Sequence, residues 1–420
     1  MKIKKIKYLI IGGGVTGLSF ASYLKSEDYL ILEKESEVGG YCRTIYKKDF
    51  IWDYAGHFFH FADKEIKEMF LKDIPEEELI FKEKNTKIFF HETLIDYPFQ
   101  KNIHQLKKED FIECLYYLFN KEEKERYENF EEMLYGKFGK GITESFLKPY
   151  NEKLYACELN KLDVNSMGRF FPYADIKEVI SNMKNNNNNN SSYNNTFLYP
   201  KKGAKVFIDS LLTKLDKNNI KLNTAVKEID KKRKVIKTEV EEIEYEYLIN
   251  TSPFNKFIEM VDKRDEVYTS NKVLVFNLGF NKKSLYEDTH WIYYPEKELN
   301  FYRVGFYDNI LDFNKASLYV EIGFKEGAII NVEEELKKTL INLKKVGIID
   351  EHELEEYSTL VMNPAYVHVS KESNENFEMV EKELNNSQIY TAGRYGAWKY
   401  CSIEDNVIEA RDLAYKLDRG

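Results

Sequence analysis

A glycine-rich turn between two short apolar runs constrains this chain more than any other feature of its sequence. Residues 7–11 (KYLII) form a continuous β-prone run, which is typical of a strand buried on both faces. The turn GGGVTG at 12–17 follows at once, and a helical pattern over 18–24 leads to a second β-prone run at 29–32, which ends in Glu33. This order of strand, glycine turn, helix, strand and acid predicts a Rossmann-like dinucleotide site.

Four residues of this unit have separate physical roles. Gly12 permits the tight turn, Gly14 lets a pyrophosphate approach the backbone, and Gly17 allows the helix to pack closely on the strand. The helix N-terminus attracts the anion. Glu33 can accept hydrogen bonds from the hydroxyls of an adenosine ribose, and its charge disfavours a 2′-phosphate. We therefore expect all four residues to bind the cofactor.

A second glycine pair identifies which dinucleotide is expected. The segment EVGGYCR at 37–43 places Gly39 and Gly40 where the backbone can approach another part of the cofactor. Arg43 can neutralise the cofactor's phosphate or contact its ring system. This arrangement resembles the FAD-binding opening of the glutathione-reductase-like flavoproteins, especially the amine-oxidase branch. We therefore expect FAD.

The pattern along the chain predicts an α/β fold with a discontinuous Rossmann-like FAD-binding domain, a helical insertion and an antiparallel-sheet substrate domain. The insertion ends in an Asn-rich loop, a low-complexity segment. The expected boundaries are 1–63, 196–262 and 386–420 for the FAD-binding domain, 64–195 for the insertion with its loop at 184–195, and 263–385 for the substrate domain.

Charge and cysteine usage exclude several functional classes. A net charge of −9 argues against nucleic-acid binding, which needs a basic face. The four cysteines lie far apart without zinc spacing, which suits a reducing cytosol and a cytoplasmic protein. Glycines interrupt the apolar run near the N-terminus, so we expect no stable membrane insertion.

Five further segments resemble the UDP-galactopyranose mutase family, more its eukaryotic-like branch than the common bacterial one. They lie in order over nearly the whole chain, at 55–60 (AGHFFH), 96–102 (DYPFQKN), 150–156 (YNEKLYA), 301–303 (FYR) and 393–400 (GRYGAWKY). The resemblance implies an FAD-dependent isomerase that interconverts the pyranose and furanose forms of a UDP-linked hexose, for surface-polysaccharide precursors. In such mutases N5 of the reduced flavin attacks the anomeric carbon and UDP leaves.

The arginines of this chain are scarce. The chain has nine arginines and 53 lysines, so an arginine is expected where the planar guanidinium is needed to bind phosphate through two hydrogen bonds. By the resemblance, Arg169 and Arg303 hold the substrate diphosphate and are catalytic, whereas Arg43 and Arg394 lie near the flavin together with Gly393. A structural ion pair is the alternative for any one of them.

Four tyrosines fall at or beside aromatic positions that line the sugar and uridine pocket of that family. They are Tyr155, Tyr293, Tyr366 and Tyr400. The alternative for each, taken singly, is a place in the core or on the surface. The resemblance therefore implies that they bind the substrate.

His57 matches the family histidine next to the flavin ring, where it helps to hold reduced N5 and counts among the catalytic residues. A core histidine in an aromatic patch is the alternative. His57 and His60 could share a helix face, but no third ligand accompanies them, so no metal site is predicted.

The segment after Tyr400 departs from the family, which continues with Glu and then an Asn-Gln pair. Here the run is CSIEDN at 401–406, and Glu404 would repel a substrate phosphate unless it points elsewhere. Two alternatives therefore stay open: a flavin-dependent oxidoreductase of the amine-oxidase or protoporphyrinogen-oxidase type, and a carrier like the Rab GDP-dissociation inhibitors. The intact cofactor residues Gly14 and Glu33 argue against the carrier.

The expected ligands follow from these assignments. FAD would be active in its reduced form, with NAD(P)H as a candidate electron donor, and the substrate would be a UDP-hexose. Association into a homo-oligomer is compatible with the sequence.

Overall fold

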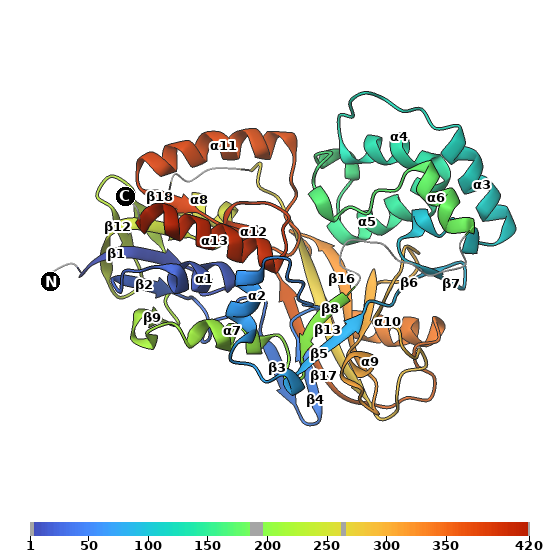
Figure 1. The fold of residues 1–420 in the computed structure, drawn as a ribbon, viewed down its shortest axis with the longest axis horizontal. Coiled ribbons are helices and arrows are strands. Elements are labelled where there is room, and N and C mark those ends of the chain that lie inside the picture. Colours follow the sequence, from blue (N-terminus) through green and yellow to red (C-terminus); the bar gives the residue numbers. More distant parts are fainter. Residues whose placement is uncertain (1–3, 185–195, 262–265, 419–420) are drawn as a thin grey trace.

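The computed structural model describes residues 4–184, 196–261 and 266–418. Two large sheets, each with helices packed on it, form an α/β fold (Figure 1). The predicted Asn-rich loop lies outside the described residues, apart from Lys184. Within the described ranges, no helix is long and apolar enough to cross a membrane.

The first sheet is centred on β1 (Lys4–Ile11), the strand that leads into the glycine turn. It pairs in parallel with β2 (Tyr29–Leu32) and β12 (Glu242–Asn250). The four residues of β2 and the last four of β1 are buried, as expected for a parallel sheet covered on both faces. The other strands are β9 (Ile220–Lys221) and β18 (Ile389–Thr391), both parallel, and β10 (Glu228–Asp230) and β11 (Val235–Lys237), both antiparallel.

Helices that follow or precede these strands in the sequence cover the first sheet. Figure 1 shows α1 and α13 side by side on one face, where they pack against each other. The helices associated with the sheet are α1 (Val15–Tyr23), α2 (Lys64–Leu71), α7 (Lys205–Leu212), α8 (Phe254–Val261), α11 (Lys371–Asn386), α12 (Gly393–Gly396) and α13 (Ile403–Asp418).

The second sheet contains most of the strands predicted for the substrate domain. In order they are β17 (Leu354–Met362), β13 (Asn271–Phe280), β16 (Ser317–Lys325), β15 (Arg303–Phe306), β14 (Trp291–Tyr293), β6 (Thr86–Phe90) and β7 (Thr93–Asp96). All neighbours are antiparallel except β14 and β6. The pair β6–β7 comes from the segment predicted as a helical insertion. Helices α9 (Tyr307–Leu311) and α10 (Val332–Lys345) belong to this half, and the domain boundaries stay a prediction.

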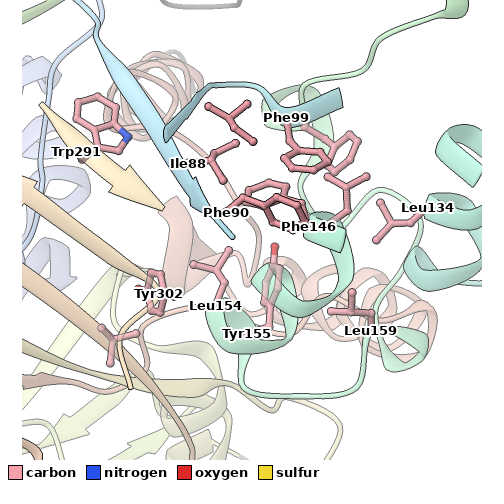
Figure 2. Close-up of a cluster of buried hydrophobic side chains, with 14 of the residues drawn as sticks. Ile88, Phe90, Phe99, Leu134, Phe146, Leu154, Tyr155, Leu159, Trp291 and Tyr302 are labelled. Atoms are coloured by element: carbon pink, nitrogen blue, oxygen red, sulfur yellow. The ribbon is translucent and has the colours of Figure 1, made fainter. Parts of the chain in front are cut away.

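The helices of the insertion form a lobe beside the second sheet (Figure 1). They are α3 (Lys108–Phe119), α4 (Phe130–Ile142), a π-helical turn (Thr143–Leu147), α5 (Lys148–Tyr155) and α6 (Ile176–Lys184). Figure 2 shows how side chains of α4 and α5 meet Phe90 of β6 and Tyr302 next to β15 in one buried cluster. This cluster fixes α5 against the strands that carry Tyr293 and Arg303.

Two short antiparallel strand pairs form separate two-stranded sheets. Strand β3 (Thr44–Lys47) pairs with β4 (Phe50–Asp53), and β5 (Leu79–Glu83) pairs with β8 (Thr196–Pro200). Six short 3₁₀ turns complete the described chain, at Glu76–Glu78, Phe99–Lys101, Ile103–Gln105, Leu159–Lys161, Gly168–Phe170 and Lys217–Asn219.

Candidate functional site

The glycine turn after β1 leaves open space beside one of its glycines. Gly12 has a φ of +101°, and a Cβ on Gly17 would lie 2.1 Å from the Gly12 carbonyl oxygen. A Cβ on Gly14 would meet nothing nearer than the Cα of Gly40, at 4.0 Å. Backbone packing therefore requires glycine at 12 and 17, whereas the absence of a side chain at Gly14 only keeps a space open.

The second glycine pair is hydrogen-bonded to the first turn. The N–H of Gly39 donates to the Gly13 carbonyl at 2.8 Å, and both Gly39 and Gly40 have positive φ. Glu33 lies beside them, where its carboxylate accepts the N–H of Gly13 at 2.7 Å and that of Glu35 at 2.9 Å. A carboxylate has about four acceptor positions, so Glu33 retains capacity for a ribose hydroxyl.

The turn after β18 completes the same cradle. The side-chain oxygen of Asn406 in α13 accepts the Thr16 hydroxyl at 2.9 Å and the N–H of Arg394 at 2.7 Å. A Cβ on Gly393 would lie 2.3 Å from the Thr16 hydroxyl. The start of α1 carries no side-chain cap and no acid in its first turn, so its N–H groups can receive an anion. The cradle therefore fits the diphosphate of a dinucleotide.

Arg43 and Arg394 are largely buried, and the Nε of each has no hydrogen-bond acceptor among the residues that the structure describes. Arg43 lies 3.9 Å from a carboxylate oxygen of Glu37. Arg394 lies over three aromatic rings, at 4.5 Å from the ring centre of Tyr400, 5.2 Å from that of Tyr366 and 5.9 Å from that of Tyr395. Among the described residues, no carboxylate forms an ion pair with Arg394. Such a buried charge is costly, which points to a bound anion or polar ligand.

Arg303 is the most firmly held of the four arginines. It stands directly opposite Glu321 on neighbouring antiparallel strands, and its Nε and Nη2 bind the two carboxylate oxygens of Glu321 at 3.0 and 2.5 Å. The side chain of Arg303 is 19% exposed and that of Glu321 only 1%. The fork of Arg303 thus binds a protein carboxylate, as the ion-pair alternative anticipated, and a ligand can only add to that pair.

Arg169 lies at the exposed edge of the same region. Its Nη2 binds Asp405 at 2.5 Å, and its side chain is 51% exposed. The neighbouring Phe170 meets Tyr400 edge-on, with ring centres 5.4 Å apart. The structure therefore connects Arg169 to the tyrosines around Arg394, although the guanidinium itself faces Asp405.

Three of the four tyrosines predicted for the substrate form one aromatic group, and the ring of the fourth, Tyr293, contacts Tyr97 and Tyr150. Tyr366 stacks on Tyr400, with ring centres 6.1 Å apart, and meets Tyr155 edge-on at 5.7 Å. Burial raises the pKa of Tyr293 and of Tyr366, and the nearby charge of Arg303 opposes that rise in both. Tyr155 is almost fully buried, and its hydroxyl has no hydrogen-bond partner in the described part of the chain. Arg303 and Arg394 both lie close enough to Tyr366 for their charges to act on its hydroxyl.

His57 lies close enough to Glu321, Arg303 and Arg394 for their charges to affect its pKa. Its Nδ1 lies 3.1 Å from the Ala55 carbonyl, which can only accept, so the ring carries its proton on Nδ1 and leaves Nε2 unprotonated. Burial lowers the pKa of His57 to about 4, while the hydrogen bond to Ala55 opposes this shift. Glu321 also opposes it, whereas Arg394 and Arg303 add to it.

We expect His57 to remain neutral at every pH at which the enzyme works. Because its folded pKa is lowered, the folded state binds this proton less well than the unfolded chain, and stability falls as the pH drops from about 6.5 toward 4. An NMR titration of the imidazole, assigned by its loss in His57→Gln, should give a midpoint near 4. A midpoint near 6.5 would show that the ring is solvated and not buried.

The comparison with known proteins places the chain in a family. The model of the flavin-containing amine oxidoreductases matches residues 15–264, which is more than half of the chain. The chain belongs to this family. The predicted relation to the amine-oxidase branch is therefore confirmed, and FAD is the cofactor that the family binds and that the glycine cradle fits.

Solved structures of flavoenzymes share the fold over almost the whole chain. A reduced UDP-galactopyranose mutase superposes with a TM-score of 0.92 at 23% identity, over 98% of this chain and 93% of the mutase. A proposed protoporphyrinogen oxidase from Exiguobacterium sp. 255-15 gives 0.75 at 17%, over 100% and 99%. Cyclohexylamine oxidase from Brevibacterium oxydans gives 0.70 at 10%, over 99% of each chain. The predicted α/β fold and the likeness to the mutase architecture are confirmed.

Two further residues beside Arg303 were not among the predicted ones. Glu321 is a buried carboxylate in the otherwise apolar strand LYVEIGF, and that contrast was a readable signal. Tyr319 has a buried hydroxyl with no hydrogen-bond partner within residues 4–184, 196–261 and 266–418. This hydroxyl lies only 2.5 Å from where a Cβ on Gly56 would be. No local pattern distinguishes Tyr319 from the other 30 tyrosines.

Proposed function

We propose that this flavoenzyme is an FAD-dependent isomerase that interconverts the pyranose and furanose forms of a UDP-linked hexose, for surface-polysaccharide precursors. The observation that carries the proposal is the environment of Arg394: a buried guanidinium among three tyrosine rings, with no carboxylate paired to it in the described chain. Because Arg394 is predicted to lie near the flavin, the ligand that would compensate this charge is bound FAD together with an anionic substrate held beside it. The likeness in fold to the reduced mutase supports the same assignment.

The chain's own residues would each hold one part of such a substrate. Arg169 and Arg303 would bind the diphosphate, the flat faces of Tyr366 and Tyr400 would contact uracil and sugar, and buried aromatic walls would exclude water. Neutral His57 would offer Nε2 as an acceptor beside the flavin. Bound reduced FAD would supply the nucleophile for the anomeric carbon. We further propose NAD(P)H as reductant and a cytoplasmic location.

The decisive test is incubation of the reduced holoenzyme with UDP-galactopyranose, with separation of the products. We expect the furanose form and no net oxidation, and no turnover by the oxidised enzyme. Oxygen consumption with an amine or porphyrinogen, without isomerisation, would instead support the oxidoreductase alternative, which the family membership also allows.

Arg394→Ala should lower kcat/KM for the UDP-sugar by about 30-fold or more, because a buried charged hydrogen-bond partner contributes about 2–5 kcal/mol. The matched control is Arg233→Ala, which removes a guanidinium that is 57% exposed and lies 3.9 Å from Glu242. The control should behave as the unaltered enzyme. Equal kinetics for both variants would remove Arg394 from the site.

A further inference from the structure

The acids at the start of α13 lie where the sequence departs from the mutase pattern, and they point in different directions. The carboxylate of Glu404 is buried and accepts the N–H groups of Ala62 and Asp63 at 2.6 and 2.8 Å. Glu404 therefore points away from a substrate phosphate. Asp405, in contrast, is the acid that faces Arg169.

The position of Asp405 is fixed independently of Arg169. One carboxylate oxygen accepts both the N–H and the hydroxyl of Ser402, each at 2.9 Å, and the Asp405 N–H donates back to that hydroxyl at 3.1 Å. The other oxygen binds Arg169. The start of α13 thus fixes a negative charge beside the guanidinium of Arg169, which belongs to the distant turn Gly168–Phe170.

The Arg303–Glu321 and Arg169–Asp405 ion pairs differ in how easily a ligand can break them. The Arg303–Glu321 pair is bidentate, and Glu321 is almost fully buried. In the Arg169–Asp405 pair, Nη2 binds a single carboxylate oxygen, and the arginine is half exposed. Solvent-exposed ion pairs contribute little free energy, so an arriving polyanion can displace Asp405 at little cost.

We propose that Asp405 is an internal counter-ion that competes with the diphosphate of the ligand for Arg169, and thereby sets the affinity of the site. The inference rests on the proposed function, because it assigns that diphosphate to Arg169. In the ligand-free chain the pair neutralises Arg169 and holds its turn beside Tyr400. When a diphosphate binds, it takes over the guanidinium, and Asp405 keeps its hydrogen bonds to Ser402.

The test measures binding of UDP and of inorganic pyrophosphate to the holoenzyme by calorimetry, at low and moderate salt. Asp405→Asn should tighten both ligands about two- to five-fold, the range expected for loss of an exposed pair, and more at low salt. Asp412→Asn is the matched control, because it removes one charge from the same helix at a residue paired with Arg411. The control should change neither affinity.

A double-mutant cycle with Arg169→Gln separates competition from simple repulsion. If the two anions compete, Asp405→Asn has no effect on ligand affinity once Arg169 is replaced. The same tightening with and without Arg169 would overturn the proposal. Weaker or unchanged binding in Asp405→Asn alone would overturn it as well. Hydrogen exchange of residues 166–171 in ligand-free Asp405→Asn should also be faster than in Asp412→Asn, and unchanged exchange would contradict the pairing.

Failure of the function and failure of the inference are distinguishable. If the unaltered holoenzyme binds pyrophosphate but not UDP, and Asp405→Asn tightens pyrophosphate, the competition stands and the nucleotide assignment falls. If it binds neither ligand, the diphosphate site and the competition both fall.

Discussion

Arg303→Ala should both destabilise the protein and abolish UDP binding. The substitution leaves Glu321, 1% exposed, as a buried charge without the guanidinium that holds both of its oxygens. Breaking a buried pair from one side costs about 3–5 kcal/mol, so the free energy of unfolding should fall by about that amount. Chemical denaturation and UDP calorimetry on the same preparation measure the two effects.

A second variant separates the structural effect from the ligand effect. Replacing both partners, as Arg303→Met with Glu321→Met, removes the unpaired charge and fills similar volume, so most of the lost stability should return. UDP binding should not return, because the guanidinium of Arg303 is still absent. Restored UDP binding in the double variant would show that Arg303 serves only to neutralise Glu321.

The glycine turn could be predicted because its conformation is set locally. The φ of Gly12 and the contact between Gly17 and the Gly12 carbonyl depend on residues within six positions of one another. The strands β6 and β7 could not be separated from the helical insertion in the same way. They have only five and four residues, and β6 owes its place to pairing with the distant β14.

The scarcity of arginine drew attention to Arg169 and Arg303, but it could not predict which carboxylates they pair with. Glu321 meets Arg303 because β15 and β16 pair in one particular register, and Asp405 meets Arg169 across 236 positions of sequence. Such pairs form through tertiary structure, so residue type and spacing do not encode them. For the same reason the hydrogen bonds of Glu404 to the amides of Ala62 and Asp63 became clear only in the structure.

Gly14→Ala should yield a folded protein that has lost most of its FAD. The backbone of Gly14 has a φ of −79°, which alanine adopts freely, and the added Cβ would meet no protein atom nearer than 4.0 Å. The methyl group would instead enter the space that the cradle leaves for the cofactor. Overpacking of this kind costs about 1–3 kcal/mol, which weakens FAD binding roughly 5- to 150-fold. Flavin absorbance per chain after dialysis measures the loss.

Two other glycines make this result specific to the cofactor. Gly17→Ala should destabilise the protein whether or not FAD is present, because its Cβ would lie 2.1 Å from a backbone oxygen. Gly327→Ala should change nothing, because no atom lies within 4 Å of its added Cβ. Gly14→Ala, in contrast, should lose flavin while the stability of its FAD-free form stays that of the unaltered protein. Full flavin content in Gly14→Ala would show that the open space beside α1 does not receive the cofactor, and the assignment of the diphosphate to this turn would then be wrong.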